Sequence, residues 1–199
     1  MDKNFSAILG VALILIVLIS GVINTVKTKI NQTPNENYSL SETSILYKDK
    51  TNGYSIYYPK DFSMIETDDT KTFDIPIKNY FNTILANEAR LTISKPSSKC
   101  PQSEGDQIVS AGEIKSGDIV FKKDNWSGVG AGQLYVGADY TTLKNGLCYS
   151  IHIFTHSTNG AGFYIDDPVE IKKIDDEHAA DMKKFLEAID GIVSTFKFL

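Results

Sequence analysis

The sequence predicts an α+β protein in which an N-terminal transmembrane helix precedes an antiparallel sheet flanked by helices. Three observations support this prediction. Residues 4–26 contain no charged side chain, the second half holds two alternating runs joined by Asn-Gly, and apolar residues recur at helical spacing near the C-terminus. We therefore expect an anchor over residues 1–26, a polar linker over residues 27–44 and a folded domain over residues 45–199.

The anchor is predicted from its length and composition. Residues 5–23 are apolar except for two serines and two glycines, and as a helix they would measure about 28 Å, close to the roughly 30 Å hydrocarbon core of a bilayer. A cleaved signal peptide is the alternative. It would have a shorter apolar region and a small-residue cleavage site, for which SGVIN is a poor match. Lys3 before the span and Lys27 and Lys29 after it leave the orientation open on charge alone.

The two cysteines favour a domain outside the cytosol. Cys100 and Cys148 are the only cysteines, and such a pair in a small extracytoplasmic domain commonly forms a disulfide. Two unrelated buried thiols are the alternative. A bridge would pin a long excursion over residues 101–132, rich in Gly, Ser and Asp, against the sheet and leave its tip free for a partner. We expect a single-pass protein of the cell membrane whose C-terminal domain is extracytoplasmic.

The first half of the folded domain shows short β-rich runs and one helical pattern. ILYKD and YSIYY flank the turn KTNG, and Pro59 ends the second run before DFSMI begins another. A helix is predicted to begin at Pro76, because the following apolar residues fall at i, i+3, i+4, i+7 and i+8. These residues are Ile77, Tyr80, Phe81, Ile84 and Leu85. EARLTIS then alternates as a strand.

The second half is predicted to form a hairpin, a helix and a short strand. QLYVGADYTTL and LCYSIHIF are joined at Asn145 and Gly146, which both tolerate positive φ. An amphipathic helix follows, with the acidic residues 175–177 at its start. Its apolar stripe consists of Ala179, Met182, Phe185, Leu186, Ile189 and Val193. STFKFL alternates Phe196 and Phe198 as a terminal strand.

The sequence singles out no catalytic, cofactor-binding or metal-binding residue. His152 and His156 would lie about 13 Å apart on a strand, too far to share an ion. The glycines of GVGAGQ precede a strand rather than a helix, which favours a hairpin loop over a phosphate site. Trp126, in the same loop, is either a core anchor or a partner contact. The acidic residues around 166–167 and 175–177 lack a calcium-loop pattern, and no Gly-x-Ser-x-Gly elbow exists.

The charge balance argues against nucleic acid as a partner. The chain has 20 Lys and Arg against 25 Asp and Glu, a formal net charge of −5. Nucleic-acid binding depends on basic surface that displaces counterions from phosphate. The expected partners are the membrane, through the N-terminal helix, and a protein or cell-envelope component; no cofactor is expected.

GYSIYYPKDF near the start of the folded domain, together with the terminal helix and IVSTFKF, resembles the PsbP-like fold, an α/β/α sandwich in which helices cover an antiparallel sheet. The chain also resembles uncharacterised single-anchor bacterial proteins of the extracytoplasmic side. The resemblance covers residues 45–199 and brings no catalytic residue with it. Its motif residues Tyr54, Pro59, Phe62, Phe196 and Phe198 would fill core or turn positions. It implies a non-catalytic, membrane-anchored binding or accessory module of unknown ligand; the alternative is a cell-envelope enzyme of hydrolase type.

Overall fold

The structure is a computed structural model that describes residues 43–103, 107–163 and 166–199. Within those ranges no helix combines the length and the apolar character that a membrane span requires. The predicted anchor and most of the linker lie in residues 1–42, outside the described part of the chain.

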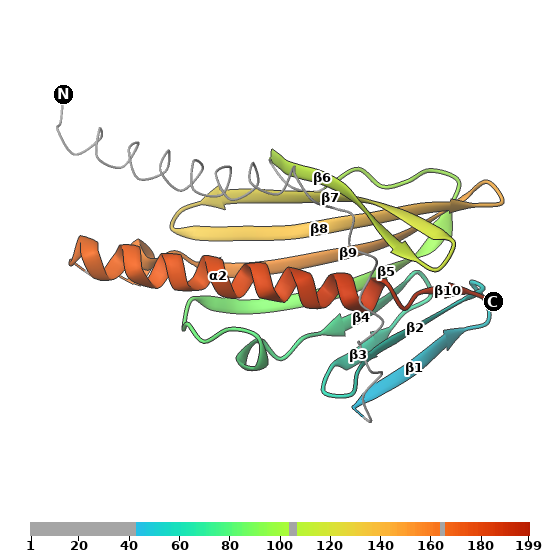
Figure 1. Cartoon of the computed structure of the whole chain (residues 1–199), viewed down its shortest axis with the longest axis horizontal. Helices are drawn as coiled ribbons and strands as arrows, with labels where there is room; N and C mark the ends of the chain where they lie inside the picture. The colour runs from blue at the N-terminus through green and yellow to red at the C-terminus, as the bar shows by residue number, and fades with distance from the viewer. Residues whose placement is uncertain (1–42, 104–106, 164–165) are drawn as a thin grey trace. The chain divides into compact units, whose positions relative to one another are not determined.

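The described residues form two antiparallel sheets and one long helix (Figure 1). The large sheet has seven strands in the order β3-β4-β5-β9-β8-β7-β6, and the small sheet has the order β1-β2-β10. The strands are β1 (Ser44–Asp49), β2 (Tyr54–Pro59), β3 (Ser63–Glu66), β4 (Thr70–Asp74), β5 (Ala86–Ser97), β6 (Gln107–Ser116), β7 (Ile119–Gly130), β8 (Gln133–Lys144), β9 (Leu147–Thr158) and β10 (Lys197–Phe198). The helical elements are the 3-10 turns η2 (Ile77–Asn79) and η3 (Gly160–Phe163) and the α-helix α2 (Pro168–Val193).

The predicted hairpins are confirmed where the turn chemistry is strong. Asn145 and Gly146 join β8 to β9 with φ of 54° and 76°, the left-handed conformation that this dipeptide adopts at low cost. The β1–β2 hairpin forms around Gly53, and the GVGAGQ segment turns from β7 into β8. β10 pairs with β2, which confirms the terminal strand.

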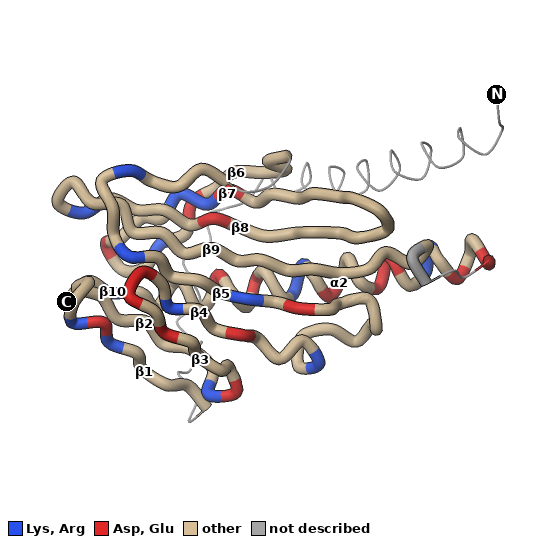
Figure 2. The backbone as a smooth tube through the Cα atoms, turned by 180° about the vertical axis from the view of Figure 1, so that it is seen from behind, with Lys and Arg blue, Asp and Glu red and all other residues tan. Residues whose placement is uncertain are grey.

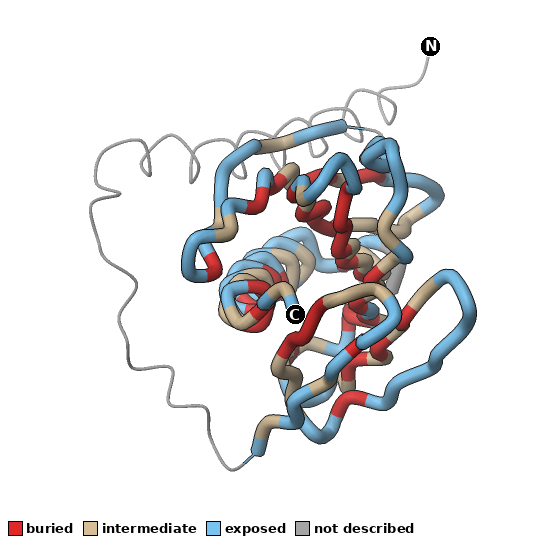
Figure 3. The backbone as a smooth tube through the Cα atoms, turned by 90° about the vertical axis from the view of Figure 1, so that its right-hand side faces the viewer, coloured by how far each residue is buried: buried red, intermediate tan, exposed pale blue. Residues whose placement is uncertain are grey.

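The described elements cover the large sheet on one face only. α2 and the small sheet lie side by side on that face (Figure 1), and Figure 3 shows the helix end-on beside strands that contain buried stretches. Seen from behind in Figure 2, the strands of the large sheet lie in front of α2, and no described helix covers them from that side. The expectation that helices flank the sheet is therefore corrected: among the described elements, α2 covers one face. We call the opposite side the open face.

The helix α2 begins earlier than the sequence pattern suggested. Asp167 caps it by accepting hydrogen bonds from the backbone N–H groups of Val169 (2.8 Å) and Glu170 (3.4 Å), with Pro168 in the first turn. Asp167 is thus the N-cap of α2. Asp175, predicted at the helix start, instead lies two turns inside the helix and accepts a hydrogen bond from the Gly160 N–H at 2.8 Å. Burial raises the pKa of Asp175 above its usual value.

The helix predicted to begin at Pro76 is wrong, since only η2 forms there. Phe81 and Leu85 are buried as the stripe predicted, whereas Ile84 is 68% exposed. The backbone N–H of Asn82 donates to the Asp181 carboxylate of α2 at 2.7 Å, and the Asn82 amide donates to the same carboxylate at 2.9 Å. These tertiary hydrogen bonds replace helical ones, and β5 already starts at Ala86. Packing against α2 therefore overrides the local periodicity.

The excursion predicted over residues 101–132 is largely a hairpin of the large sheet. β6 and β7 pair along most of their length, and Gly117 supplies the positive φ of 59° in their turn. The abundance of Gly, Ser and Asp suggested a loop, but the segment also alternates, with Phe121 buried toward the core and Lys122 exposed. The expected free tip is therefore corrected to a tight β-turn.

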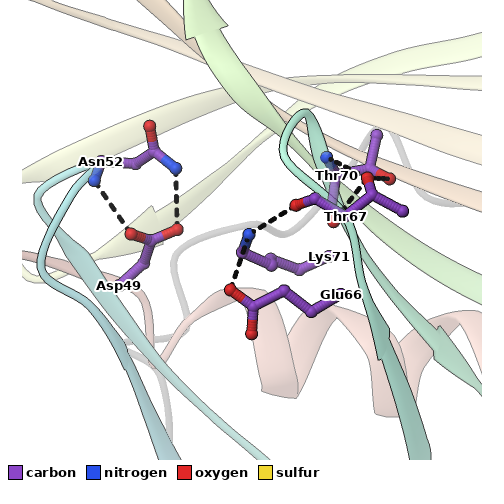
Figure 4. Close-up of polar contacts among 6 residues, drawn as sticks. All are labelled: Asp49, Asn52, Glu66, Thr67, Thr70 and Lys71. Carbon is purple, nitrogen blue, oxygen red and sulfur yellow. Dashed lines mark hydrogen bonds and ion pairs between the residues drawn. The ribbon is translucent and has the colours of Figure 1, made fainter.

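Two hairpin turns bring polar side chains together where the small sheet meets the β3–β4 hairpin (Figure 4). Asp49 accepts hydrogen bonds from the backbone and side-chain N–H groups of Asn52 at 2.9 and 2.8 Å. The buried Lys71 pairs with Glu66 at 2.9 Å and donates to the Thr67 carbonyl at 2.9 Å. Burial alone would raise the pKa of Asp49, but the Asn52 hydrogen bonds and the Lys71 charge lower it overall.

Candidate functional site

The open face carries a group of aromatic and histidine side chains on its central strands. Strand alternation assigns them: on β9 the odd-numbered residues from Ile151 to Ser157 are buried toward α2, while the even-numbered His152, Phe154 and His156 point the other way. We call the following residues the open-face cluster: Trp126, Tyr135, Asp139, His152, Phe154 and His156.

Strand register brings the members of the open-face cluster together. Tyr135 lies opposite His156, and Asp139 lies opposite His152. The rings of Tyr135 and His156 stack with centroids 5.0 Å apart, and those of Trp126 and His152 stack at 5.6 Å. Phe154 lies between these two pairs. The centroid of its ring is 6.4 Å from that of Trp126 and 6.1 Å from that of Tyr135. The cluster is therefore continuous across β7, β8 and β9.

Gly137 makes room for the Trp126 ring. It lies opposite Trp126 on β8, and a Cβ atom on Gly137 would come within 2.3 Å of the indole and 2.0 Å of the Ile153 carbonyl oxygen. No side chain fits in that space, so glycine is required for the indole to lie against the sheet. The ring is 2% exposed.

The polar atoms of the open-face cluster are partly paired. Asp139 Oδ1 and His152 Nδ1 are 2.6 Å apart, and His156 Nε2 and Gln133 Oε1 are also 2.6 Å apart. Asp139 Oδ2 and Trp126 Nε1 are buried and form no hydrogen bond within the described part of the chain. A buried donor and a buried acceptor in one cluster are unusual, because native structures pair the great majority of such atoms.

Ion pairs border the open-face cluster. On the open face, strand register places Asp124 opposite Asp139 and Glu88 opposite His156. The basic groups nearby are themselves paired, Arg90 with Glu88 at 2.6 Å and Lys122 with Asp124 at 2.6 Å. Among the described residues, the basic side chains that border the cluster are therefore engaged in ion pairs rather than free to attract a polyanion.

A second histidine cluster lies inside the domain. His178 Nε2 is 2.9 Å from Ser157 Oγ, and His178 Nδ1 is 2.9 Å from Thr83 Oγ1. Burial lowers the pKa of His178, although the Asp181 charge opposes this effect. The pair resembles part of a hydrolytic Ser-His arrangement, but Ser157 is 1% and His178 4% exposed. This geometry ties α2 to β9 and gives a substrate no access.

A third polar cluster fastens the C-terminal part of α2 to the covered face of the sheet. Lys123 donates to both oxygens of Asp190 at 2.7 and 2.9 Å, and the Tyr140 hydroxyl donates to Asp190 Oδ1 at 2.7 Å. Burial, followed by the Asp190 charge, raises the pKa of Tyr140 well above its usual value. Its polar groups satisfy one another, so we assign this cluster to helix attachment.

The structure places the residues singled out in the sequence as follows: two form a disulfide, one is buried in a strand, and two lie on the open face. Cys100 and Cys148 form a disulfide with Cα atoms 5.2 Å apart, which fastens the segment after β5 to β9. Trp126 lies in β7 rather than in a loop, and its buried ring offers a partner almost no surface. His152 and His156 share the open face with Phe154 between them, and the described residues contain no group of three metal-ligating side chains.

Sequence reasoning missed Tyr135 and Asp139 as members of a site. The available signal was the hairpin register: once Asn145 and Gly146 fix the turn, counting outward pairs Asp139 with His152 and Tyr135 with His156. No such signal marks Trp126, because the glycines that follow it predict a loop at this point of the chain.

Comparisons with known proteins find similarity only at the level of structure. No protein-family model matches the sequence, and a search of curated proteins finds no match. The structure is similar to the solution structure of cyanobacterial PsbP (CyanoP) from Synechocystis sp. PCC 6803, with 13% identity, a TM-score of 0.45, and coverage of 85% of this chain and 99% of that one. This similarity agrees with the PsbP-like fold that the sequence resemblance implies.

Two further structures share parts of the arrangement. A crystal structure from Bacteroides thetaiotaomicron covers 73% of this chain at 13% identity and a TM-score of 0.36, and this chain spans 45% of that longer protein. Protein PA94 of unknown function from Pseudomonas aeruginosa covers 66% of this chain, and 94% of its own length, at 13% identity and a TM-score of 0.32. Similarities of this strength carry neither activity nor partners to the present chain.

Proposed function

We propose that the domain is a membrane-anchored, extracytoplasmic binding module that contacts a protein or cell-envelope component through the open face of its large sheet. The observation that carries the proposal is the asymmetry of the sheet. One face packs against α2 and the small sheet, and the other presents aromatic and histidine side chains held in contact with one another. Rigid strands position such side chains more firmly than loops do.

The chemistry of the buried clusters supports a binding role over catalysis. The Ser157–His178 pair is buried beneath α2. The Lys123–Asp190 pair joins β7 to α2 and so stabilises the attachment of the helix. The open face is where the described residues combine aromatic surface with polar atoms that have capacity left.

Capture of partners from solubilised membranes tests the proposal. The full-length protein should retain a stoichiometric partner, and Phe154→Ala should weaken retention because it removes the ring that joins the two stacked pairs. Ile84→Ala is the matched control, since it removes an exposed apolar side chain that belongs to no strand. Equal retention by both variants would count against the open face as the binding surface.

The membrane placement is proposed from the apolar run at residues 5–23 and from the disulfide. Protease added to intact spheroplasts should digest the domain. Complete protection until detergent is added would place the domain in the cytosol instead.

A hydrolase acting on the envelope is the second candidate, and the Asp139–His152 pair favours it. A carboxylate that orients a histidine is a common general-base arrangement, and Asp124 adds a second carboxylate opposite Asp139. Under this candidate the wild-type protein would release reducing ends or new amino groups from purified peptidoglycan, and Asp139→Asn would abolish the release. Absence of release by the wild type would leave the binding role.

A further inference from the structure

Building on the proposed binding role of the open face, we infer that the open-face cluster takes a neutral carbohydrate, one hydroxyl group of which accepts a hydrogen bond from Trp126 Nε1 and donates one to Asp139 Oδ2. Four buried side-chain polar atoms lack a hydrogen-bond partner within the described ranges. Two of the four belong to this cluster, which makes it the place where a ligand would satisfy the most unpaired groups.

The chemistry of these two atoms restricts the ligand. Indole N–H is only a donor, and an ionised carboxylate is only an acceptor. A single group that satisfies both must accept and donate at once, which a hydroxyl does. An ammonium group has no acceptor, and a fully ionised phosphate has no donor. Asp139 Oδ1 already lies 2.6 Å from His152 Nδ1, so the carboxylate is held in place and Oδ2 is the oxygen left for the ligand.

The surrounding side chains favour a sugar ring over a charged polymer. The half-buried rings of Phe154 and Tyr135 border the pair, and ligand sites typically combine apolar or aromatic surface with a few placed polar groups. A sugar ring matches this pattern, since it carries C–H surfaces as well as hydroxyls. Arg90 and Lys122, the basic side chains that border the cluster, are engaged with Glu88 and Asp124 and so offer little attraction to an anionic polymer.

Access requires a side chain to move. Trp126 is 2% exposed, and the side chains of Asp139 and His152 are 12% and 22% exposed. We expect rotation of the half-buried Phe154 to open the way to both atoms while His152 Nδ1 stays beside Asp139 Oδ1, since side-chain rotamer changes are common on binding.

The single Trp of the chain makes the site directly observable. Because Trp126 is the only tryptophan, its fluorescence reports on the open-face cluster alone. The full-length protein, purified in lauryldimethylamine oxide to avoid sugar-based detergents, is titrated with the N-acetylglucosamine tetramer and with cellotetraose. We expect a saturable shift in emission with at least one of the two oligosaccharides.

Variants separate the inferred contact from a general effect on folding. Asp139→Asn keeps the size of the side chain and replaces the charged acceptor, so it should weaken binding about tenfold to a hundredfold. The matched control is Asp74→Asn, which changes an exposed carboxylate of the same sheet beside Arg90 and should bind as the wild type does. Circular dichroism melting curves verify that both variants are folded.

The outcomes also separate this inference from the proposed function. No change in emission with either oligosaccharide, or equal affinity of Asp139→Asn and wild type, overturns the carbohydrate inference. If, in addition, a captured protein partner is lost in Phe154→Ala, the open face is still the binding surface and only the ligand class is wrong. If Phe154→Ala also retains as much of the captured partner as the wild type does, the proposed function fails as well.

Discussion

The two faces of the large sheet are built from the same strands, yet their side chains differ in how deeply they are buried. On β5 and β9 the residues Leu91, Ile151 and Ile153 are buried against the other layer, whereas their neighbours Thr92, His152 and Phe154 lie on the open face. The covered face contributes stability through burial. Apart from the buried Trp126, the aromatic and histidine side chains of the open face are only half-buried. They gain less from burial and call for another explanation, which binding supplies.

Polar groups show the same contrast. On the covered side His178 has Ser157 and Thr83 as partners, and Asp190 has Lys123 and Tyr140. On the open face Asp139 Oδ2 and Trp126 Nε1 form no hydrogen bond within the described residues. The groups that attach α2 are satisfied internally, whereas two of the four buried atoms without a hydrogen-bond partner among the described residues lie where we place the ligand.

The largest effect should come from truncating the covered face. Phe185→Ala removes a ring that is 1% exposed and packs 5.3 Å from Phe81 and 5.5 Å from Tyr80. We expect a loss of about 3 to 5 kcal/mol in the free energy of unfolding. Phe154→Ala on the open face should cost about 1 kcal/mol. Urea unfolding of both variants measures the difference, and equal losses would contradict the distinction between the faces.

Removal of the disulfide should have the next largest effect. The bridge spans a sequence separation of 48 residues, and its loss typically costs about 2 to 4 kcal/mol. Cys100→Ser and Cys148→Ser should lower the melting temperature by nearly the same amount, with the double variant no worse than either. Differential scanning calorimetry checks this expectation. Two freely alkylated thiols in protein from its native compartment, seen by mass spectrometry, would refute the bridge.

The buried histidine should make stability depend on pH. Burial lowers the pKa of His178 from 6.5, with Asp181 opposing, so the folded protein binds this proton more weakly than the unfolded chain. The stability that neutral His178 contributes is therefore complete above about pH 6.5 and is lost as the pH falls toward the folded pKa. His178→Gln should flatten the dependence of melting temperature on pH between 7 and 5. Lys183→Gln, exposed on the same helix, should keep it.

The smallest effect is expected from the exposed ion pairs of the open face. Arg90 pairs with Glu88 and Asp74, but its side chain is 48% exposed. Arg90→Gln should change the free energy of unfolding by less than about 0.5 kcal/mol. A loss above about 2 kcal/mol in chemical unfolding would show that this face, too, is needed for the fold.

Local patterns predicted much of the sheet because turn chemistry and alternation are short-range. Asn145 and Gly146 fix the turn between β8 and β9, and the register then follows residue by residue. The C-terminal helix was recognised from its apolar stripe, but its start was placed at the acidic residues 175–177 because the true cap, Asp167, precedes a first turn with little periodicity.

The remaining errors arise where distant residues decide. Asp181 captures the Asn82 N–H and prevents the helix predicted from Pro76, which no local pattern reveals. The β6–β7 hairpin was not predicted, because the Gly, Ser and Asp content of the segment is typical of a loop. The open-face cluster was missed for a similar reason: alternation shows which residues share a face, but it does not show which face the helix will leave uncovered.

Site-directed photocrosslinking in intact cells tests the central claim most directly. A photoreactive amino acid replaces Thr92, which lies opposite His152 on the open face, or Lys183, which lies exposed on α2. Our account predicts a crosslinked product from position 92 and none from position 183. A product from position 183 alone, or none from position 92, would contradict the claim that the open face is where this protein binds.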